Sequence, residues 1–249
     1  MITHECFPPA GRKLPAQYTS LLRNDDQSEA EETLNVNKSH WNNNFVHEAN
    51  SIEYVYKSLL DIIRKNGTAR FVDIGAQEGL YCMYFNSLDS VRVDSYEPCP
   101  ISYKCLVDNI KLNGCKYKIV PYNFAITDYK GRAILKSSKT EPFIKTLAQR
   151  SSKFKEFDET EVMTDTLDNL YAVRKIDFIR CSTEGSEYFA LRGGFTVLKR
   201  DKPVLLITVN EANMSDCQVR TKELFDLLDH LDYKQKLVID YENIVFVAK

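Results

Sequence analysis

Hydrophobic and polar positions follow two periods along the chain, and together they predict one helix followed by alternating strands and helices. Between residues 46 and 67, apolar residues recur every three or four positions, and Asn66-Gly67 supplies a stop signal for this helix. From residue 69 onward, short apolar runs alternate with helical patterns. The runs predicted as strands are ARFVDIG, VRVDSYE, KYKIVPYNFAI, GRAILKS, KIDFIRCS, KPVLLITVN, YKQKLVID and NIVFVAK.

The intervening segments have helical spacing. They are EGLYCMYFNSL, PISYKCLVDNIKLNG, TDTLDNLYAVR, EGSEYFALRGGFTVLKR and VRTKELFDLLDHL. Strands that alternate with helices are typical of a mostly parallel sheet covered on both faces. We therefore predict an α/β, Rossmann-like fold with about seven strands, which ends in an antiparallel hairpin around Tyr241-Glu242.

Two segments have no clear period, and they define the predicted organisation. Residues 1–44 are polar and include the acidic stretch RNDDQSEAEETLNVNKSH, which favours a partly flexible arm. A lid or an oligomer contact anchored by Trp41 is the alternative for this arm. Residues 45–249 form the predicted domain, with a lid or insertion at about 137–161.

Composition narrows the class of protein. A net charge of -2 gives no overall basic field for nucleic acid. No apolar run is long enough to span a bilayer, and the first residues lack the apolar core of a signal peptide. Seven cysteines without a CxxC pair favour a reducing, cytoplasmic compartment, and four scattered histidines predict no metal site.

The segment FVDIGAQEGLYCMYF places two glycines, Gly75 and Gly79, directly after an apolar strand. A strand that ends in a glycine turn and opens a helix is typical of a nucleotide-like ligand site, where glycine lets the backbone approach the ligand. The spacing D-x-G-x-x-x-G differs from the dinucleotide and P-loop fingerprints, and the turn has no lysine. We therefore expect a ligand without a pyrophosphate.

A carboxylate follows the next strand at Glu97, 24 positions after Asp73. In nucleotide-binding α/β units a ribose-binding carboxylate appears after about 20 positions. Glu97 is thus a candidate to bind ribose hydroxyls, and Asp73 a candidate to meet the ammonium of an amino acid. Ribose with an amino acid and no phosphate describes S-adenosylmethionine. An ordinary tight turn, with Glu97 as a surface charge, is the alternative.

Five motifs in order resemble those of the FkbM-type methyltransferases. They are FVDIGAQEGLY, SYEPCPISYKCLVDNIKLNG, FAITDYKGRAIL, TDTLDNL and IDFIRCSTEGSEYFALRGG. The resemblance implies a class I methyltransferase fold. It also implies an enzyme that uses S-adenosylmethionine to methylate hydroxyl oxygens of sugars, natural products or related small molecules.

The resemblance also implies a set of cofactor contacts, with adenine near the segment after the third strand. These expected contacts are Asp73, Gly75, Ala76, Gly79, Tyr81, Glu97, Pro98, Asn123 and Ala125.

Two departures from the family pattern bear on catalysis. Ser182 stands where the family has aspartate in IDVEG, and Thr208 stands where it has glutamate in PxIxxExN. Removing a proton from an acceptor hydroxyl needs a base, and a serine hydroxyl titrates too high to serve alone. We expect Glu184 to supply the base beside Ser182, with Glu187 one turn further on. The alternative is that both glutamates only stabilise a helix N-terminus.

Three functional hypotheses follow. The favoured one is an S-adenosylmethionine-dependent methyltransferase that acts on a hydroxyl of a small molecule or glycan. A second is a catalytically impaired binding or scaffold protein that retains the cofactor pocket, which the paired loss at Ser182 and Thr208 suggests. A third is an RNA methyltransferase using the lysines of KSSKTEPFIKTLAQRSSKFKEF, but a solvated lid is favoured over a nucleic-acid partner for that segment.

Overall fold

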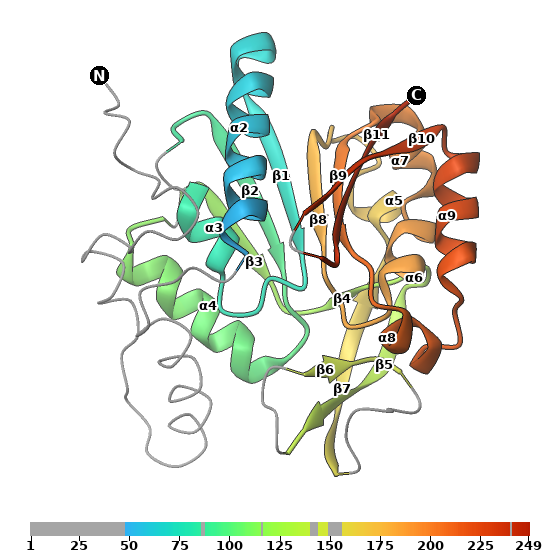
Figure 1. Ribbon diagram of the computed structural model, residues 1–249. Helices are drawn as coiled ribbons and strands as arrows, with labels where there is room; N and C mark the ends of the chain where they lie inside the picture. Colours follow the sequence, from blue (N-terminus) through green and yellow to red (C-terminus); the bar gives the residue numbers. More distant parts are fainter. Residues whose placement is uncertain (1–47, 86–87, 116, 140–143, 149–155, 240) are drawn as a thin grey trace.

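One large mixed sheet carries most of the core of the protein (Figure 1). The computed structural model describes residues 48–85, 88–115, 117–139, 144–148, 156–239 and 241–249. The sheet has seven strands, parallel from β3 to β9 and antiparallel at β11 and β10, which confirms the predicted fold class. Their order across the sheet is β10 (Tyr233–Ile239), β11 (Asn243–Ala248), β9 (Val204–Thr208), β8 (Phe178–Cys181), β1 (Ala69–Ile74), β2 (Val91–Tyr96) and β3 (Ile119–Tyr122).

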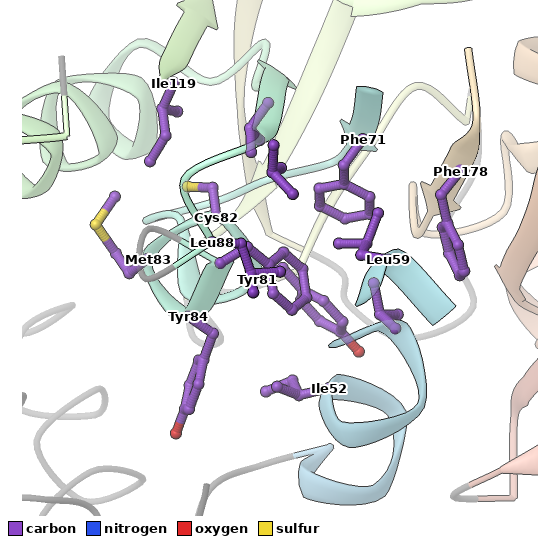
Figure 2. Packing of buried hydrophobic residues seen from close by; sticks show 14 of the residues in the cluster. Ile52, Leu59, Phe71, Tyr81, Cys82, Met83, Tyr84, Leu88, Ile119 and Phe178 are labelled. Atoms are coloured by element: carbon purple, nitrogen blue, oxygen red, sulfur yellow. The ribbon is translucent and has the colours of Figure 1, made fainter. Parts of the chain in front are cut away.

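Three helices cover one face of this sheet: α2 (Ala49–Asn66), α3 (Leu80–Phe85) and α4 (Pro100–Leu112). The predicted stop holds, since α2 ends where Gly67 adopts a φ of 81°. Figure 2 shows Ile52 and Leu59 of α2 in the same cluster of buried side chains as Phe71 of β1. These side chains are at most 1% exposed, so their burial fixes α2 against the sheet.

The opposite face carries the helices of the C-terminal part (Figure 1). They are α5 (Leu167–Leu170), α6 (Glu187–Arg192), α7 (Phe195–Asp201), α8 (Glu211–Asp216) and α9 (Thr221–His230). The single helix predicted over residues 184–200 is wrong, because Gly193 and Gly194 separate α6 from α7. A Cβ on Gly193 would overlap the carbonyl oxygen of Thr127, so the break lets another segment approach closely.

A second, four-stranded sheet lies beyond the edge where β1 and β8 end (Figure 1). Its order is β4 (Ala125–Ile126), β7 (Phe157–Asp165), β5 (Gly131–Ser138) and β6 (Lys145–Thr146). The single strand predicted over residues 116–126 is therefore wrong, since β3 stays in the large sheet and β4 joins the small one. Part of the patternless segment 137–161 is also strand. In β7, Thr164 and Asp165 are buried although they are polar, and Met163 is exposed although it is apolar, so the strand lacks a clear apolar–polar alternation in sequence.

The small sheet covers the carboxyl ends of the parallel strands, where open α/β sheets bind ligands. Residues 140–143 and 149–155 of the predicted lid fall outside the described residues, as does the polar arm of residues 1–44.

Candidate functional site

The glycine turn, residues 75–79, joins β1 to α3 and is folded onto the end of β2. The amides of Gly75 and Ala76 both donate to the carbonyl oxygen of Tyr96, at 2.9 and 3.0 Å. The amide of Gln77 donates to Glu97 Oε2 at 2.9 Å, and that of Gly79 donates to the Ala76 carbonyl at 2.8 Å. Because protein acceptors take these four amides, the turn is not a cradle for phosphate oxygens.

Both turn glycines are required by the protein's own packing. Gly75 and Gly79 have φ values of 82° and 92°, in the region that side chains disfavour. A Cβ on Gly75 would overlap the carbonyl oxygen of Ser182, and one on Gly79 would lie 2.6 Å from Leu106 Cδ1. Our expectation that these glycines clear space for a ligand needs correction, since the direction of each missing side chain is filled by protein atoms.

Glu97 follows β2 and holds two turns together. Its side chain is only 3% exposed, and its two oxygens accept the amides of Gln77, at 2.9 Å, and Cys99, at 2.8 Å. Burial raises the pKa of Glu97 to about 7; the positive charge of Lys145 and the two amides lower it, and Glu78 raises it further. Each carboxylate oxygen keeps a lone pair for one more donor.

Glu97 lines a pocket between the large and small sheets, with about 530 Å³ of free space counting the part open to solvent. The turn side of the wall includes Gly75, Gln77 and Pro98. An apolar part of the wall comes from β4, β5 and neighbouring segments, and consists of Phe124, Ala125, Ile126, Leu135 and Leu147. The arrangement suits a ligand with one flat apolar end and hydroxyl groups beside it.

The post-β8 loop, residues 182–186, forms another part of the wall. Ser182 and Glu184 both line the pocket and are half-buried. Glu184 adopts a left-handed φ of 54°, which costs a non-glycine residue about 1–2 kcal/mol. Its Oε2 accepts a 2.7 Å hydrogen bond from Asn213 Nδ2. The pocket wall therefore includes a second residue with a carboxylate, held in place by Asn213.

Glu187, the other candidate base, has a different position. It is 2% exposed and is not part of the pocket wall. Its two oxygens accept the amides of Thr183, at 2.6 Å, and Gly185, at 3.0 Å. Burial raises the pKa of Glu187 to about 7, although the hydrogen bond from the Thr183 amide acts in the opposite direction and lowers it. Glu187 therefore holds the post-β8 loop, in agreement with the structural alternative.

Asp73 points to the opposite face of β1 from the pocket. It is fully buried, and Arg180 of β8 donates to its Oδ1 at 3.1 Å. Arg180 also lies 3.6 Å from Glu48 and stacks on the ring of Tyr81, whose hydroxyl donates to Glu48 at 2.6 Å. Asp73 and Tyr81, both expected at the cofactor, thus belong to a buried ionic cluster behind the glycine turn.

The remaining expected contacts divide in the same way. Ala125 and Pro98 line the pocket, whereas Ala76 is buried in the core. Asn123 Nδ2 donates to the carbonyl oxygens of Glu97 and Pro98, at 2.9 and 3.0 Å, so it fixes the segment that carries Glu97.

Thr208 does not line the pocket, although it ends a parallel strand. Its hydroxyl donates to Asn243 Oδ1 at 2.8 Å, and Asn243 Nδ2 donates to Ser51 at 3.2 Å. A neutral chain of side chains therefore occupies the position of the family's glutamate. The two departures from the family pattern are not equivalent, since only Ser182 reaches the pocket.

Sequence reasoning did not name Gln77, Lys145 or Leu147 as residues of the pocket wall. Gln77 lies inside a motif already recognised, and Phe124 lies inside the segment expected near adenine. Lys145 and Leu147 lie in a segment without periodicity, and no sequence signal distinguishes them.

Two kinds of site are not found in the described part of the chain. No group of three or more histidine, cysteine, aspartate or glutamate side chains there could hold a metal ion. Within the same residues, no helix combines the length and apolar character needed to cross a membrane.

Comparison with known proteins identifies one family. A family model described as the methyltransferase FkbM domain matches residues 73–234, which include the glycine turn, Glu97 and the post-β8 loop. A comparison with curated proteins gives no match.

Two solved structures share the fold. The crystal structure of methyltransferase FkbM from Methylobacillus flagellatus KT has a TM-score of 0.51 at 19% identity, covering 72% of this chain and 43% of that chain. The crystal structure of monomeric WbdD has a TM-score of 0.53 at 8% identity, covering 84% and 44%. The chain thus matches less than half the length of either structure.

Proposed function

The chain belongs to the FkbM methyltransferase family, and from this premise we propose that it transfers a methyl group from S-adenosylmethionine to a hydroxyl oxygen of a sugar or another small molecule. The observation that carries the proposal is the position of Glu97, a buried carboxylate that faces a pocket beside the glycine turn.

The residues of the pocket fit S-adenosylmethionine in three respects. Glu97 has lone pairs left for the two ribose hydroxyls, and hydrogen bonds from hydroxyls to a carboxylate are strong. Phe124 and Leu147 offer apolar surface for a flat base. The amides of the glycine turn are already paired, which agrees with a nucleoside that carries no pyrophosphate.

Asp73 has an indirect role in this proposal. Because its carboxylate is fully buried and bound to Arg180, it positions the strand ends of β1 and β8 under the pocket. We do not assign it a contact with the amino-acid end of the cofactor.

Catalysis would depend on the post-β8 loop. S-adenosylmethionine, when bound, supplies a methyl group already activated by the positive charge on its sulfur. The protein then has to align the acceptor hydroxyl and accept its proton. Glu184 is the proposed base, because it lines the pocket, its carboxylate is held by Asn213, and its backbone has a strained conformation. Ser182 can hydrogen-bond the acceptor, but its own hydroxyl cannot take the proton unassisted.

Binding and turnover have to be measured separately to test this proposal. Isothermal titration of the purified protein with S-adenosylhomocysteine should show saturable binding at a single site. Incubation with S-adenosylmethionine and a panel of hydroxylated sugars and small molecules should release S-adenosylhomocysteine with at least one acceptor. Absence of both binding and release would refute the proposal.

The same experiment addresses the two alternatives. Binding without release from any acceptor would point to the impaired scaffold protein, for which Ser182 at the pocket is the supporting observation. Release that requires RNA would point to the RNA methyltransferase. Much of the lysine-rich segment that suggested RNA, including residues 140–143 and 149–155, lies outside the described residues.

A further inference from the structure

Strand β6 of the small sheet and the residue after it contact both the pocket and the post-β8 loop. Lys145 of β6 and Leu147, which follows the strand, line the pocket. Thr146 lies between them, is 4% exposed, and donates from its hydroxyl to the carbonyl oxygen of Glu184 at 3.0 Å. The same hydroxyl accepts the amide of Ala148 at 3.1 Å. This anchoring fixes where the side chain of Lys145 can lie.

Lys145 is the one cationic side chain in the described wall of the pocket, which also holds the carboxylates of Glu97 and Glu184. Its charge acts on Glu97, and it is the strongest of the influences that favour the ionised form of that carboxylate. The amides of Cys99 and Gln77 act in the same direction, while burial and the nearby Glu78 oppose them. Glu97 is thus a nearly buried acid whose charge depends on a residue from another sheet.

We propose that Lys145 is a positioning residue that favours the ionised form of Glu97, so that β6 sets the pH range in which the protein binds its nucleoside ligand. The inference rests on the proposed function, because it assigns the ribose of the cofactor to Glu97. It goes beyond that function by making the small sheet part of the cofactor site.

The chemistry of hydrogen bonding explains why ionisation matters. An ionised Glu97 accepts from both ribose hydroxyls while it keeps the amides of Gln77 and Cys99. Protonation of Glu97 converts one of these acceptor sites into an O–H donor, which then faces the donor of a ribose hydroxyl or a backbone amide. One hydrogen bond is lost, and a polar group is left unpaired. Affinity should therefore rise with pH and level off above the pKa of Glu97. Without Lys145 the rise should move to higher pH, because burial and Glu78 then act with less opposition.

Two measurements on Lys145→Met test the inference. Carbon-13 NMR of side-chain carboxyls, without ligand and with Glu97→Gln for assignment, should show Glu97 titrating at higher pH, by on the order of one pH unit. Titration with S-adenosylhomocysteine between pH 5.5 and 9 should show affinity about 5–10-fold weaker at pH 7 and nearly restored at pH 9. Lys145→Arg should recover both properties, because it restores the charge.

Lys139→Met is the matched control, since Lys139 is an exposed lysine after β5 that pairs with Asp158 and does not line the pocket. It should leave both curves unchanged. An unaltered Glu97 titration in folded Lys145→Met would overturn the inference, as would an affinity loss equal at every pH, which indicates direct ligand contact. If the wild type binds no S-adenosylhomocysteine but Lys145→Met still shifts Glu97, the proposed function fails while the coupling of Lys145 to Glu97 stands.

Discussion

The glycine turn and the post-β8 loop are each held by a buried glutamate, but only one of these glutamates lines the pocket. In each, a glutamate with at most 3% exposure accepts two backbone amides, and burial raises its pKa to about 7. Glu97 lines the pocket, whereas Glu187 does not. Burial and a raised pKa therefore do not identify a ligand-binding carboxylate. The distinguishing property is whether the residue lines the pocket.

The two regions also differ in how closely they follow the family pattern. The glycine turn and Glu97 match the motifs, whereas the ends of β8 and β9 carry Ser182 and Thr208 in place of carboxylates. The loss at Ser182 alters the pocket wall directly, with Glu184 as the nearest carboxylate there. The loss at Thr208 alters a contact between β9 and β11.

The largest expected effect comes from the point where the two regions touch. In Gly75→Ala, the new methyl group would overlap the carbonyl oxygen of Ser182, on a residue whose φ is 82°. We expect the free energy of unfolding to fall by more than about 3 kcal/mol, measured by urea denaturation. Gly67→Ala is the control, because Gly67 has a φ of 81° with no atom near its missing side chain. It should lose only about 1 kcal/mol; equal losses would mean that the contact with Ser182 does not matter.

The second prediction separates the regions by catalysis. Glu184→Gln should lower kcat by about 10²–10⁴-fold on the acceptor found in the panel, because the proposed base is removed. The affinity for S-adenosylhomocysteine should stay within about twofold, since the glycine turn is untouched. Glu211→Gln, on an exposed glutamate of α8, is the matched control and should behave like the wild type. An unchanged kcat in Glu184→Gln would remove Glu184 from the mechanism.

The third prediction separates the regions by binding. Glu97→Gln should weaken S-adenosylhomocysteine about 10–100-fold by calorimetry, because a charged acceptor for the ribose is replaced by a neutral group that is partly a donor. Glu78→Gln changes a neighbouring residue of the turn that does not line the pocket, so its affinity should match or slightly exceed that of the wild type. If both variants bind like the wild type, the assignment of the ribose to Glu97 is wrong.

Sequence reasoning worked best where the signal is local. Gly75 and Glu97 follow apolar strands at a recognisable spacing, so their meeting at one sheet edge follows from strand order alone. It failed where the cause is a distant contact. Gly193-Gly194 lies within a helical pattern, and the break depends on the approach of Thr127.

The pocket wall shows the same limit. Lys145 and Leu147 reach the pocket only because the short strand β6 pairs with β5. A strand this short shows no apolar–polar periodicity in the sequence. Glu184 and Glu187 lie three positions apart at one helix start, so the sequence could not tell which faces the pocket. Backbone conformation decides it, through the left-handed turn at Glu184.

The fourth prediction uses pH to compare the two buried glutamates. Burial raises the pKa of both Glu97 and Glu187 from 4.5 to about 7 in the folded protein. Between these values the folded state binds more protons than the unfolded state, so the free energy of unfolding should fall as pH rises through 7. Removal of either carboxyl, in Glu97→Gln or Glu187→Gln, should flatten this fall by on the order of 2 kcal/mol.

Urea denaturation at several pH values between 4.5 and 8 measures the slope for each variant. Glu161→Gln, at an exposed residue of β7, should keep the slope of the wild type. A slope equal to that of the wild type in both buried-site variants would show that neither carboxyl is protonated in the folded protein near pH 6.

The smallest effect is expected at Thr208, and it tests whether this position belongs to the site. In Thr208→Val the donor to Asn243 Oδ1 is lost, and Asn243 is only 5% exposed. We expect a loss of about 1–2 kcal/mol in the free energy of unfolding, with no change in affinity for S-adenosylhomocysteine. Thr208→Ser keeps the hydroxyl and should lose less. A change of more than about threefold in affinity would instead connect Thr208 to the pocket. Thr208→Glu would place a carboxylate against Asn243 Oδ1, which is also an acceptor. A glutamate is therefore compatible with this position only if the Asn243 amide rotates and loses its hydrogen bond to Ser51.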